Sequence, residues 1–281
     1  ISEFRKYPRQ GVLAGLPDDG LMYEMGRQIA RDMRSMKIDV NFAPVVDVNL
    51  HPDVNTIKDR SFGPDKNLVA DYGSAVMRGM QDGGVVACAK HFPGHGDTEV
   101  DSHKALPVLK FPKERLDSVE LYPFRRLIKD GVEMVMVGHL LVPVLDTLPA
   151  SVSKVVVTDL LRKKMKFRGL IITDALGMEG VLEPFGGSGA KATLAAYKAG
   201  VDILLMPDNV SESIDLIVDY IGDDRRKLKD LDARVSRVLA LKGKCGKLTG
   251  RDDLSVDPAA VDTKGTDALI TTIEETLAAG R

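Results

Sequence analysis

Short apolar segments alternate with amphipathic helical patterns along most of this chain, and no other feature of the sequence constrains the fold as much. The apolar segments are rich in β-branched residues and cover residues 38–48, 84–92, 132–140, 169–176 and 201–207. Each is almost continuously apolar at its centre, which is typical of parallel strands that are buried on both faces. The sequence therefore predicts a parallel sheet built from these segments.

Helical patterns fill the intervals between the predicted strands. The first covers residues 18–36, where apolar side chains recur at three- and four-residue steps, as on the buried face of a helix. Similar patterns predict helices over residues 66–82, 113–129, 154–165, 189–199, 211–221 and 225–243. We therefore expect an α/β protein, either an open doubly wound sheet or a (β/α)8 barrel.

Side chains that could carry chemistry lie at the C-terminal ends of four of the predicted strands. They are Asp47, Lys90, His91, His139 and Asp174. Because a barrel collects its reactive residues from the C-terminal ends of many strands, this distribution favours the (β/α)8 TIM barrel. Such a barrel has eight strands and only five are predicted. We therefore expect this chain to lack the first strands of its barrel, about 60–90 residues by the length of a βαβ unit.

The alternation of strands and helices ends near residue 245. We therefore predict an N-terminally incomplete barrel over residues 1–245, and a linker with a C-terminal helical extension over residues 246–281. The helical pattern of the second region covers residues 266–279 and would suit the start of a second domain.

The charge balance and the cysteine count exclude some classes of protein. Lys and Arg total 39 and Asp and Glu total 41, so no excess of charge suits nucleic acid or an anionic membrane. No apolar run reaches the ~18 residues that a membrane-spanning helix needs. Cys88 and Cys245 are too few for a disulfide framework. We expect a small neutral ligand.

Residues 90–103, KHFPGHGDTEVDSH, form a loop with many titratable groups, because Pro93 and Gly94 break regular structure. His91, His95 and His103 could bind a metal. However, compact zinc sites place two histidines one helical turn apart, and Pro93 prevents that helix here. The loop also lacks the glycine and lysine spacing of a phosphate-binding loop. We therefore expect no metal and no other cofactor.

Acid–base chemistry suits this loop better. Asp101 and His103 are two residues apart, so their side chains can face the same direction, and a carboxylate beside an imidazole makes a proton shuttle near neutral pH. Asp174, in IITDALGMEG, follows a predicted strand directly, where a barrel would place a nucleophilic or charge-stabilising carboxylate. Alternatively, Asp101 only caps a turn and His103 lies on the surface. Asp174 could likewise cap the helix that follows it.

The segments KHFPGHGDTEVDSH and IITDALGMEG together resemble the family 3 glycoside hydrolases, within them the β-N-acetylglucosaminidase (β-hexosaminidase) branch. The likeness extends through NFAPVVDVN, DRSFGPD, VMVGHL and AGVDILLMP. It implies that residues 1–245 belong to the catalytic barrel of a retaining exo-glycosidase. The substrate would be terminal β-linked N-acetylglucosamine of cell-wall (muropeptide) or chitin-type saccharides.

The resemblance also implies the catalytic roles. The position of Asp174 is that of the nucleophile, and the positions of Asp101 and His103 are those of the acid/base pair. Family members also carry an N-terminal segment similar to D-x-E-G-G, whose aspartate binds the sugar. This chain contains no such segment, which agrees with the expectation that the first strands are missing.

The residues implied to bind the sugar come from other strands. The positions of Arg60, Lys90 and His91 hold sugar hydroxyl groups in the family, and the position of His139 lies near the sugar. No cofactor is implied.

Three alternatives remain open at this point. A family 3 β-glucosidase or β-xylosidase would, by the same resemblance, take its acid from a second domain, so the Asp101 and His103 pair argues against it. A metal-dependent barrel hydrolase would use the histidine cluster. A non-catalytic sugar-binding remnant of such a barrel would explain the missing strands.

Overall fold

The computed structural model describes residues 6–51, 57–96, 98, 106–246 and 262–280. Within these residues, four parallel strands form one sheet in the order β1-β2-β3-β4. They are β1 (Val40–Asn41), β2 (Val86–Phe92), β3 (Met134–Val137) and β4 (Leu170–Thr173). Parallel neighbours in chain order are what the wall of a barrel requires. The prediction of an α/β fold is confirmed, and the sheet has the arrangement of a partial TIM barrel.

The fifth predicted strand, residues 201–207, is not a regular strand. Ile203 makes one isolated parallel bridge with Ile172 of β4. Farther along, the N–H of Leu205 donates to Oγ1 of Thr173 over 3.0 Å instead of to a backbone carbonyl, which interrupts the ladder. The segment therefore lies beside β4, as the barrel interpretation requires, but the prediction of a regular strand is wrong here.

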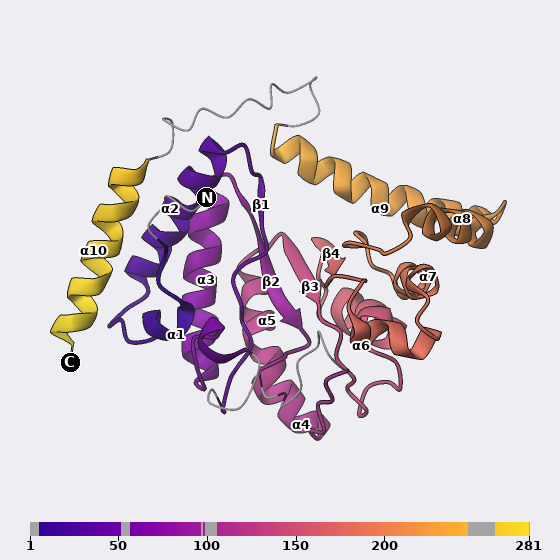
Figure 1. The fold of residues 1–281 in the computed structure, drawn as a ribbon, viewed down its shortest axis with the longest axis horizontal. Helices are drawn as coiled ribbons and strands as arrows, with labels where there is room; N and C mark the ends of the chain where they lie inside the picture. The colour runs from indigo at the N-terminus through magenta and orange to yellow at the C-terminus, as the bar shows by residue number, and fades with distance from the viewer. Residues whose placement is uncertain (1–5, 52–56, 97, 99–105, 247–261, 281) are drawn as a thin grey trace.

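Helices connect the strands (Figure 1). In the described residues they are α1 (Gln10–Leu13), α2 (Gly20–Ser35), α3 (Lys66–Asp82), α4 (Lys113–Arg115), α5 (Leu121–Lys129), α6 (Glu179–Leu182), α7 (Gly189–Ala199), α8 (Val210–Ile221), α9 (Arg225–Lys244) and α10 (Thr263–Ala279). Two π-helical segments are Leu116–Glu120 and Val155–Lys164, and three 3₁₀ turns are Lys58–Arg60, Ala150–Val152 and Glu183–Phe185. Each helix predicted from the sequence is present, with the π-helical segments inside two of them.

Capping side chains fix the first residue of two of the predicted helices. Asp65 precedes α3 and accepts the N–H of Asn67, and Ser188 precedes α7 and accepts the N–H of Lys191. Gly200 ends α7 in the left-handed conformation, with φ of 109°, which favours glycine. These boundaries follow from local chemistry, which explains why the sequence predicted them well.

Side chains of the sheet alternate between two apolar clusters. On one side, Ala87 and Val135 belong to the larger cluster, which also contains the buried faces of α2, α3 and α5. On the other side, Cys88 and Met136 belong to a smaller cluster, which apolar side chains of α9 cover in part. The second side is the one that a complete barrel would enclose.

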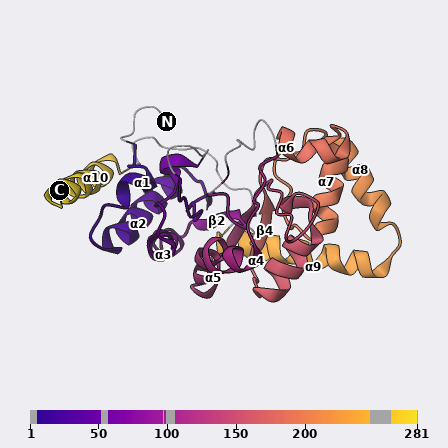
Figure 2. The same cartoon turned by 90° about the horizontal axis from the view of Figure 1, so that it is seen from below.

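The C-terminal helix α10 lies along the outer side of α2, away from the sheet, in both views of the molecule (Figures 1 and 2). Ile270 and Ile273 of α10 are buried, and Oγ1 of Thr266 lies 2.9 Å from Oδ2 of Asp32 in α2. The predicted helix in this region is therefore present. The predicted division into regions at residue 245 stays a prediction.

Candidate active site

The strand ends gather polar side chains that lie far apart in the sequence. Asp47 follows β1, Lys90 and His91 lie in the last residues of β2, His139 follows β3, and Asp174 follows β4 directly. Because the strands are parallel neighbours, their carboxyl ends share one edge of the sheet. Asp174 interacts electrostatically with His91, His139 and Lys90, so these side chains lie near one another. This edge is the candidate site.

Asp47 is fully buried and holds the loop that follows β2. Its Oδ2 lies 2.7 Å from Nδ1 of His91, and its Oδ1 accepts the backbone N–H groups of His91 and His95 over 3.1 and 2.7 Å. The backbone carbonyl of Asp47 accepts the Ser61 hydroxyl over 2.6 Å, next to Arg60. One residue thus connects a strand end, a loop and the segment that carries Arg60.

Two glycines let this loop pack closely against its neighbours. A Cβ on Gly94, whose φ is 127°, would lie 2.7 Å from Cβ of Glu120. A Cβ on Gly96 would lie 1.8 Å from the backbone oxygen of Val48. Both distances are shorter than a side-chain contact allows, so these positions require glycine for packing as well as for breaking regular structure.

Burial and neighbouring groups change the ionisation of the Asp47 cluster. Burial raises the pKa of Asp47, but the charge and hydrogen bonds of His91 and His95 outweigh it, so the pKa of Asp47 lies below its ordinary value. Burial, followed by the charge of His91, lowers the pKa of His95 to about 4. At neutral pH, Asp47 is therefore ionised and His95 is neutral.

Asp174 is a partly buried carboxylate in a cationic environment. Its Oδ1 accepts the N–H of Ala175 over 2.9 Å. Burial raises the pKa of Asp174, but His91 and His139, with smaller contributions from the Ala175 N–H and from Lys90, lower it below its ordinary value. A carboxylate that stays ionised in such a place can attack an electrophile or stabilise developing positive charge.

Arg60 and Lys90 bring hydrogen-bond donors to the same edge. Arg60 ends the turn Lys58–Arg60, and its Nη2 lies 3.4 Å from Nε2 of His91. Burial, followed by the charge of Arg60, lowers the pKa of Lys90. Both side chains only donate hydrogen bonds, so they suit the oxygens of a polar ligand.

His139 lies behind Asp174 and is only 1% exposed. Its Nε2 lies 2.9 Å from the carbonyl oxygen of Ala175, and its Nδ1 lies 2.7 Å from Oγ of Ser151. Because a carbonyl oxygen only accepts, Nε2 carries a proton and donates to Ala175. The predicted position of His139 near the sugar stays a prediction.

The predicted acid/base pair, Asp101 and His103, lies outside the described residues. After Gly96, the structure describes only Thr98 before residue 106. The role of Asp101 and His103 therefore stays a prediction.

Within the ranges given under the overall fold, no group of three or more His, Cys, Asp and Glu side chains could hold a metal ion. Over the same ranges, no helix has the length and apolar character needed to cross a membrane.

Sequence reasoning noted Asp47 at a strand end but assigned it no role, and it missed Ser61 and Ser151 entirely. The available signal for Asp47 was its position as a charged residue at the end of the apolar segment 38–48. Both serines lie in connecting segments without a recognisable motif, so only the folded chain brings them to the site.

Residues 1–241 match the family model described as "Glycosyl hydrolase family 3 N terminal domain". A protein named "Beta-hexosaminidase A" from Pseudoalteromonas piscicida is 33% identical over 260 residues, which cover 85% of this chain and 42% of that protein. A "Beta-hexosaminidase" from Methylobacillus flagellatus is 36% identical over 195 residues, which cover 68% of this chain and 55% of that protein. The chain thus spans about half the length of these relatives.

Solved structures give a similar result. A glycoside hydrolase family 3 β-N-acetylglucosaminidase from Paenibacillus sp. superposes with a TM-score of 0.89 and 35% identity, covering 97% of this chain and 52% of that one. A β-N-acetylhexosaminidase from Beutenbergia cavernae superposes with a TM-score of 0.78 and 28% identity, covering 85% of this chain and 73% of that one. Sequence and structure therefore point to the same family.

Proposed function

We propose, on the premise that this chain belongs to glycosyl hydrolase family 3, that it forms the catalytic barrel of a retaining exo-glycosidase. Its substrate would be a saccharide of the cell-wall or chitin type, from which it removes terminal β-linked N-acetylglucosamine. The names of the relatives, beta-hexosaminidase and β-N-acetylglucosaminidase, support this choice of sugar.

The position and ionisation of Asp174 carry the proposal. Its carboxylate follows β4 at the edge where the strand ends meet, and His91 and His139, with smaller contributions from the Ala175 N–H and Lys90, lower its pKa. In the proposed reaction, Asp174 attacks the anomeric carbon and forms a covalent glycosyl-enzyme as the glycosidic bond breaks. Water then hydrolyses this intermediate, so the configuration is retained.

A second group must supply and remove a proton. We assign this role to His103, supported by Asp101, on the sequence resemblance alone. His103 would donate a proton to the leaving oxygen in the first step and take a proton from the attacking water in the second.

Arg60, Lys90 and His91 would bind the hydroxyl groups of the sugar. Arg60 and Lys90 can only donate hydrogen bonds, and His91 lies between Asp47 and Arg60. His139 would act through Asp174, because its ring holds the backbone at Ala175. Such fixed partners orient the sugar for attack.

Replacing Asp174 tests the proposal directly. We expect Asp174→Ala to lower the release of para-nitrophenol from its N-acetyl-β-glucosaminide by at least about 1000-fold, because the nucleophile is lost. Sodium azide should restore release by occupying the vacated space, and the product should be the glycosyl azide of opposite anomeric configuration.

Asp159→Asn serves as the control, since Asp159 pairs with Lys163 on the exposed surface. Its turnover should equal that of the unaltered chain. No turnover by the unaltered chain would contradict the proposed function. Full turnover by Asp174→Ala would contradict the assignment of Asp174 as the nucleophile. Faster hydrolysis of the matching β-glucoside or β-xyloside by the unaltered chain would contradict the choice of sugar.

A further inference from the structure

The carboxylate of Asp47 has no part in the proposed reaction, yet it contacts the residues that build the site. It is 0% exposed, and it accepts hydrogen bonds from the side chain and backbone of His91 and from the backbone of His95. A buried carboxylate is costly unless hydrogen bonds and a partner compensate it. The end of β2 and the loop that follows it supply these partners.

The contact with His91 determines where the imidazole carries its proton. Asp47 is ionised, so Oδ2 can only accept a hydrogen bond, and Nδ1 of His91 must donate over the 2.7 Å between them. In the neutral ring, the other nitrogen, Nε2, then has one lone pair that can accept a hydrogen bond. Nε2 lies 3.4 Å from Nη2 of Arg60, and because a guanidinium group only donates, Nε2 accepts this hydrogen bond.

We propose that Asp47 is a positioning residue that keeps the His91 proton on Nδ1 and so presents Nε2 as the acceptor that holds the guanidinium group of Arg60 at the site. Asp47, His91 and Arg60 then form one chain of hydrogen bonds. The other N–H groups of Arg60 can donate to the oxygens of a ligand.

Asp47→Asn separates this role from simple support of the loop. The amide oxygen can still accept the backbone N–H groups of His91 and His95, as Oδ1 does now. The amide nitrogen then faces Nδ1 of His91 and donates to it, which moves the imidazole proton to Nε2. The volume of the side chain is nearly unchanged, so the loop can keep its conformation.

Nitrogen NMR of the chain with isotope-labelled histidine measures the tautomer without any substrate. We expect His91 of the unaltered chain to show a protonated Nδ1 and an unprotonated Nε2, assigned by the loss of both signals in His91→Gln. In Asp47→Asn, the spectrum should instead show a protonated Nε2 and an unprotonated Nδ1 for His91. A proton on Nε2 in the unaltered chain would overturn the proposal even if no variant folds.

Asp202→Asn is the matched control, because the side chain of Asp202 is also 0% exposed but binds Arg162 and Arg237. It should leave the His91 signals unchanged. Two results would show that Asp47 does not determine the tautomer of His91. One is a folded Asp47→Asn chain that keeps the proton on Nδ1. The other is an equal change of tautomer in Asp202→Asn.

A kinetic measurement extends the test and rests on the proposed function. Asp47→Asn should lower kcat/KM for the N-acetyl-β-glucosaminide by on the order of 100-fold, as expected for a misplaced binding group. The loss should come mainly from a higher KM, because Arg60, which His91 holds, would bind the ligand before and during the reaction. If the unaltered chain has no turnover, the proposed function fails, while the NMR result still decides the role of Asp47.

Discussion

At the scale of single residues, the candidate site depends on buried groups whose ionisation the fold controls. His95 is an example, because it is almost completely buried and lies beside Asp47 and His91. Burial lowers its pKa from the ordinary value of 6.5 to about 4. The folded chain therefore keeps His95 neutral at pH values where the unfolded chain would protonate it.

This difference predicts a loss of stability in mild acid. As the pH falls below about 6.5, the unfolded state takes up a proton that the folded state does not bind, so the free energy of unfolding decreases until about pH 4. The shift corresponds to roughly 3 kcal/mol. Urea unfolding at several pH values should show this slope. His95→Asn should reduce it, because the amide does not titrate but can still donate to Thr98.

His51→Asn is the control for this experiment, since His51 is exposed. It should leave the slope between pH 6.5 and 4 unchanged. An unaltered slope in His95→Asn would show that another group causes the acid sensitivity. Asp47 and Asp174 also have lowered pKa values, and the stability they contribute is lost as the pH falls from their ordinary values near 3.8 through their lower folded-state values.

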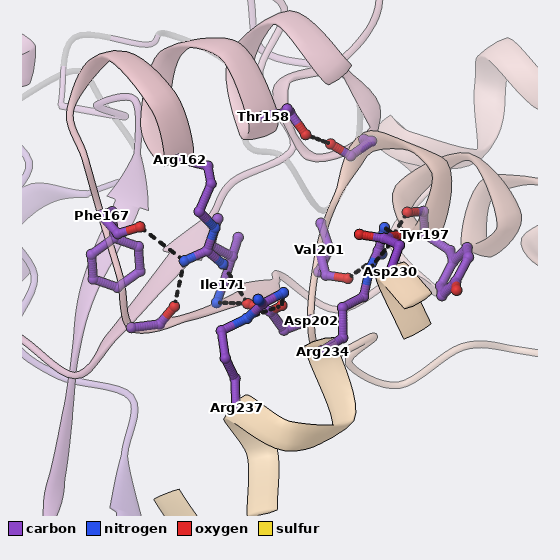
Figure 3. Close-up of polar contacts among 12 residues, drawn as sticks. Thr158, Arg162, Phe167, Ile171, Tyr197, Val201, Asp202, Asp230, Arg234 and Arg237 are labelled. Atoms are coloured by element: carbon purple, nitrogen blue, oxygen red, sulfur yellow. Dashed lines mark hydrogen bonds and ion pairs between the residues drawn. The ribbon is translucent and has the colours of Figure 1, made fainter. Parts of the chain in front are cut away.

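At the scale of elements, a buried ion-pair network attaches α9 to the sheet (Figure 3). The side chain of Asp202 is 0% exposed. Its carboxylate lies 2.6 Å from Nη2 of Arg162 in the segment Val155–Lys164 and 2.6 Å from Nη2 of Arg237 in α9. It also accepts the N–H of Ile171 in β4 over 2.8 Å. One carboxylate thus joins two helical segments and a strand.

Removing this charge should destabilise the chain strongly. We expect Asp202→Asn to lower the free energy of unfolding by about 3 kcal/mol, because two partly buried guanidinium groups lose their counter-charge. The matched change Asp159→Asn removes an exposed ion pair with Lys163 and should have a much smaller effect. Equal urea midpoints for the two variants would contradict this account of α9.

At the scale of the whole molecule, α10 packs on α2 although it lies at the other end of the sequence (Figure 1). Tyr7 donates to Asp32 over 2.6 Å, and Gln28 donates to Thr266 over 3.0 Å, so polar contacts accompany the buried isoleucines of α10. This contact predicts that α10 unfolds together with the sheet.

Ile273→Ala tests this prediction, because Ile273 is fully buried against the larger apolar cluster. The free energy of unfolding should fall by about 3 kcal/mol in a single transition. Ile214→Ala is the control, since Ile214 on α8 is 55% exposed, and it should change stability by less than about 0.5 kcal/mol. A separate early transition in Ile273→Ala would instead indicate that α10 belongs to another unit.

Local features of the sequence predicted much of the fold. Apolar segments located β2, β3 and β4, and amphipathic patterns located helices such as α3 and α7, because both signals act within a few residues of the chain. The family motifs indicated Asp174, Lys90 and His91 as site residues, and the structure places them at one edge of the sheet. Their roles stay predictions.

The sequence by itself determined the strand and helix order, the α/β class and the family, because periodicity, caps and motifs are read along the chain. Only the tertiary structure decided that Asp47 binds His91, that His139 holds Ala175, and that Thr173 interrupts the fifth predicted strand. These contacts join residues that are 32 to 44 positions apart. No local pattern encodes such pairs, since their partners meet only when the parallel strands align.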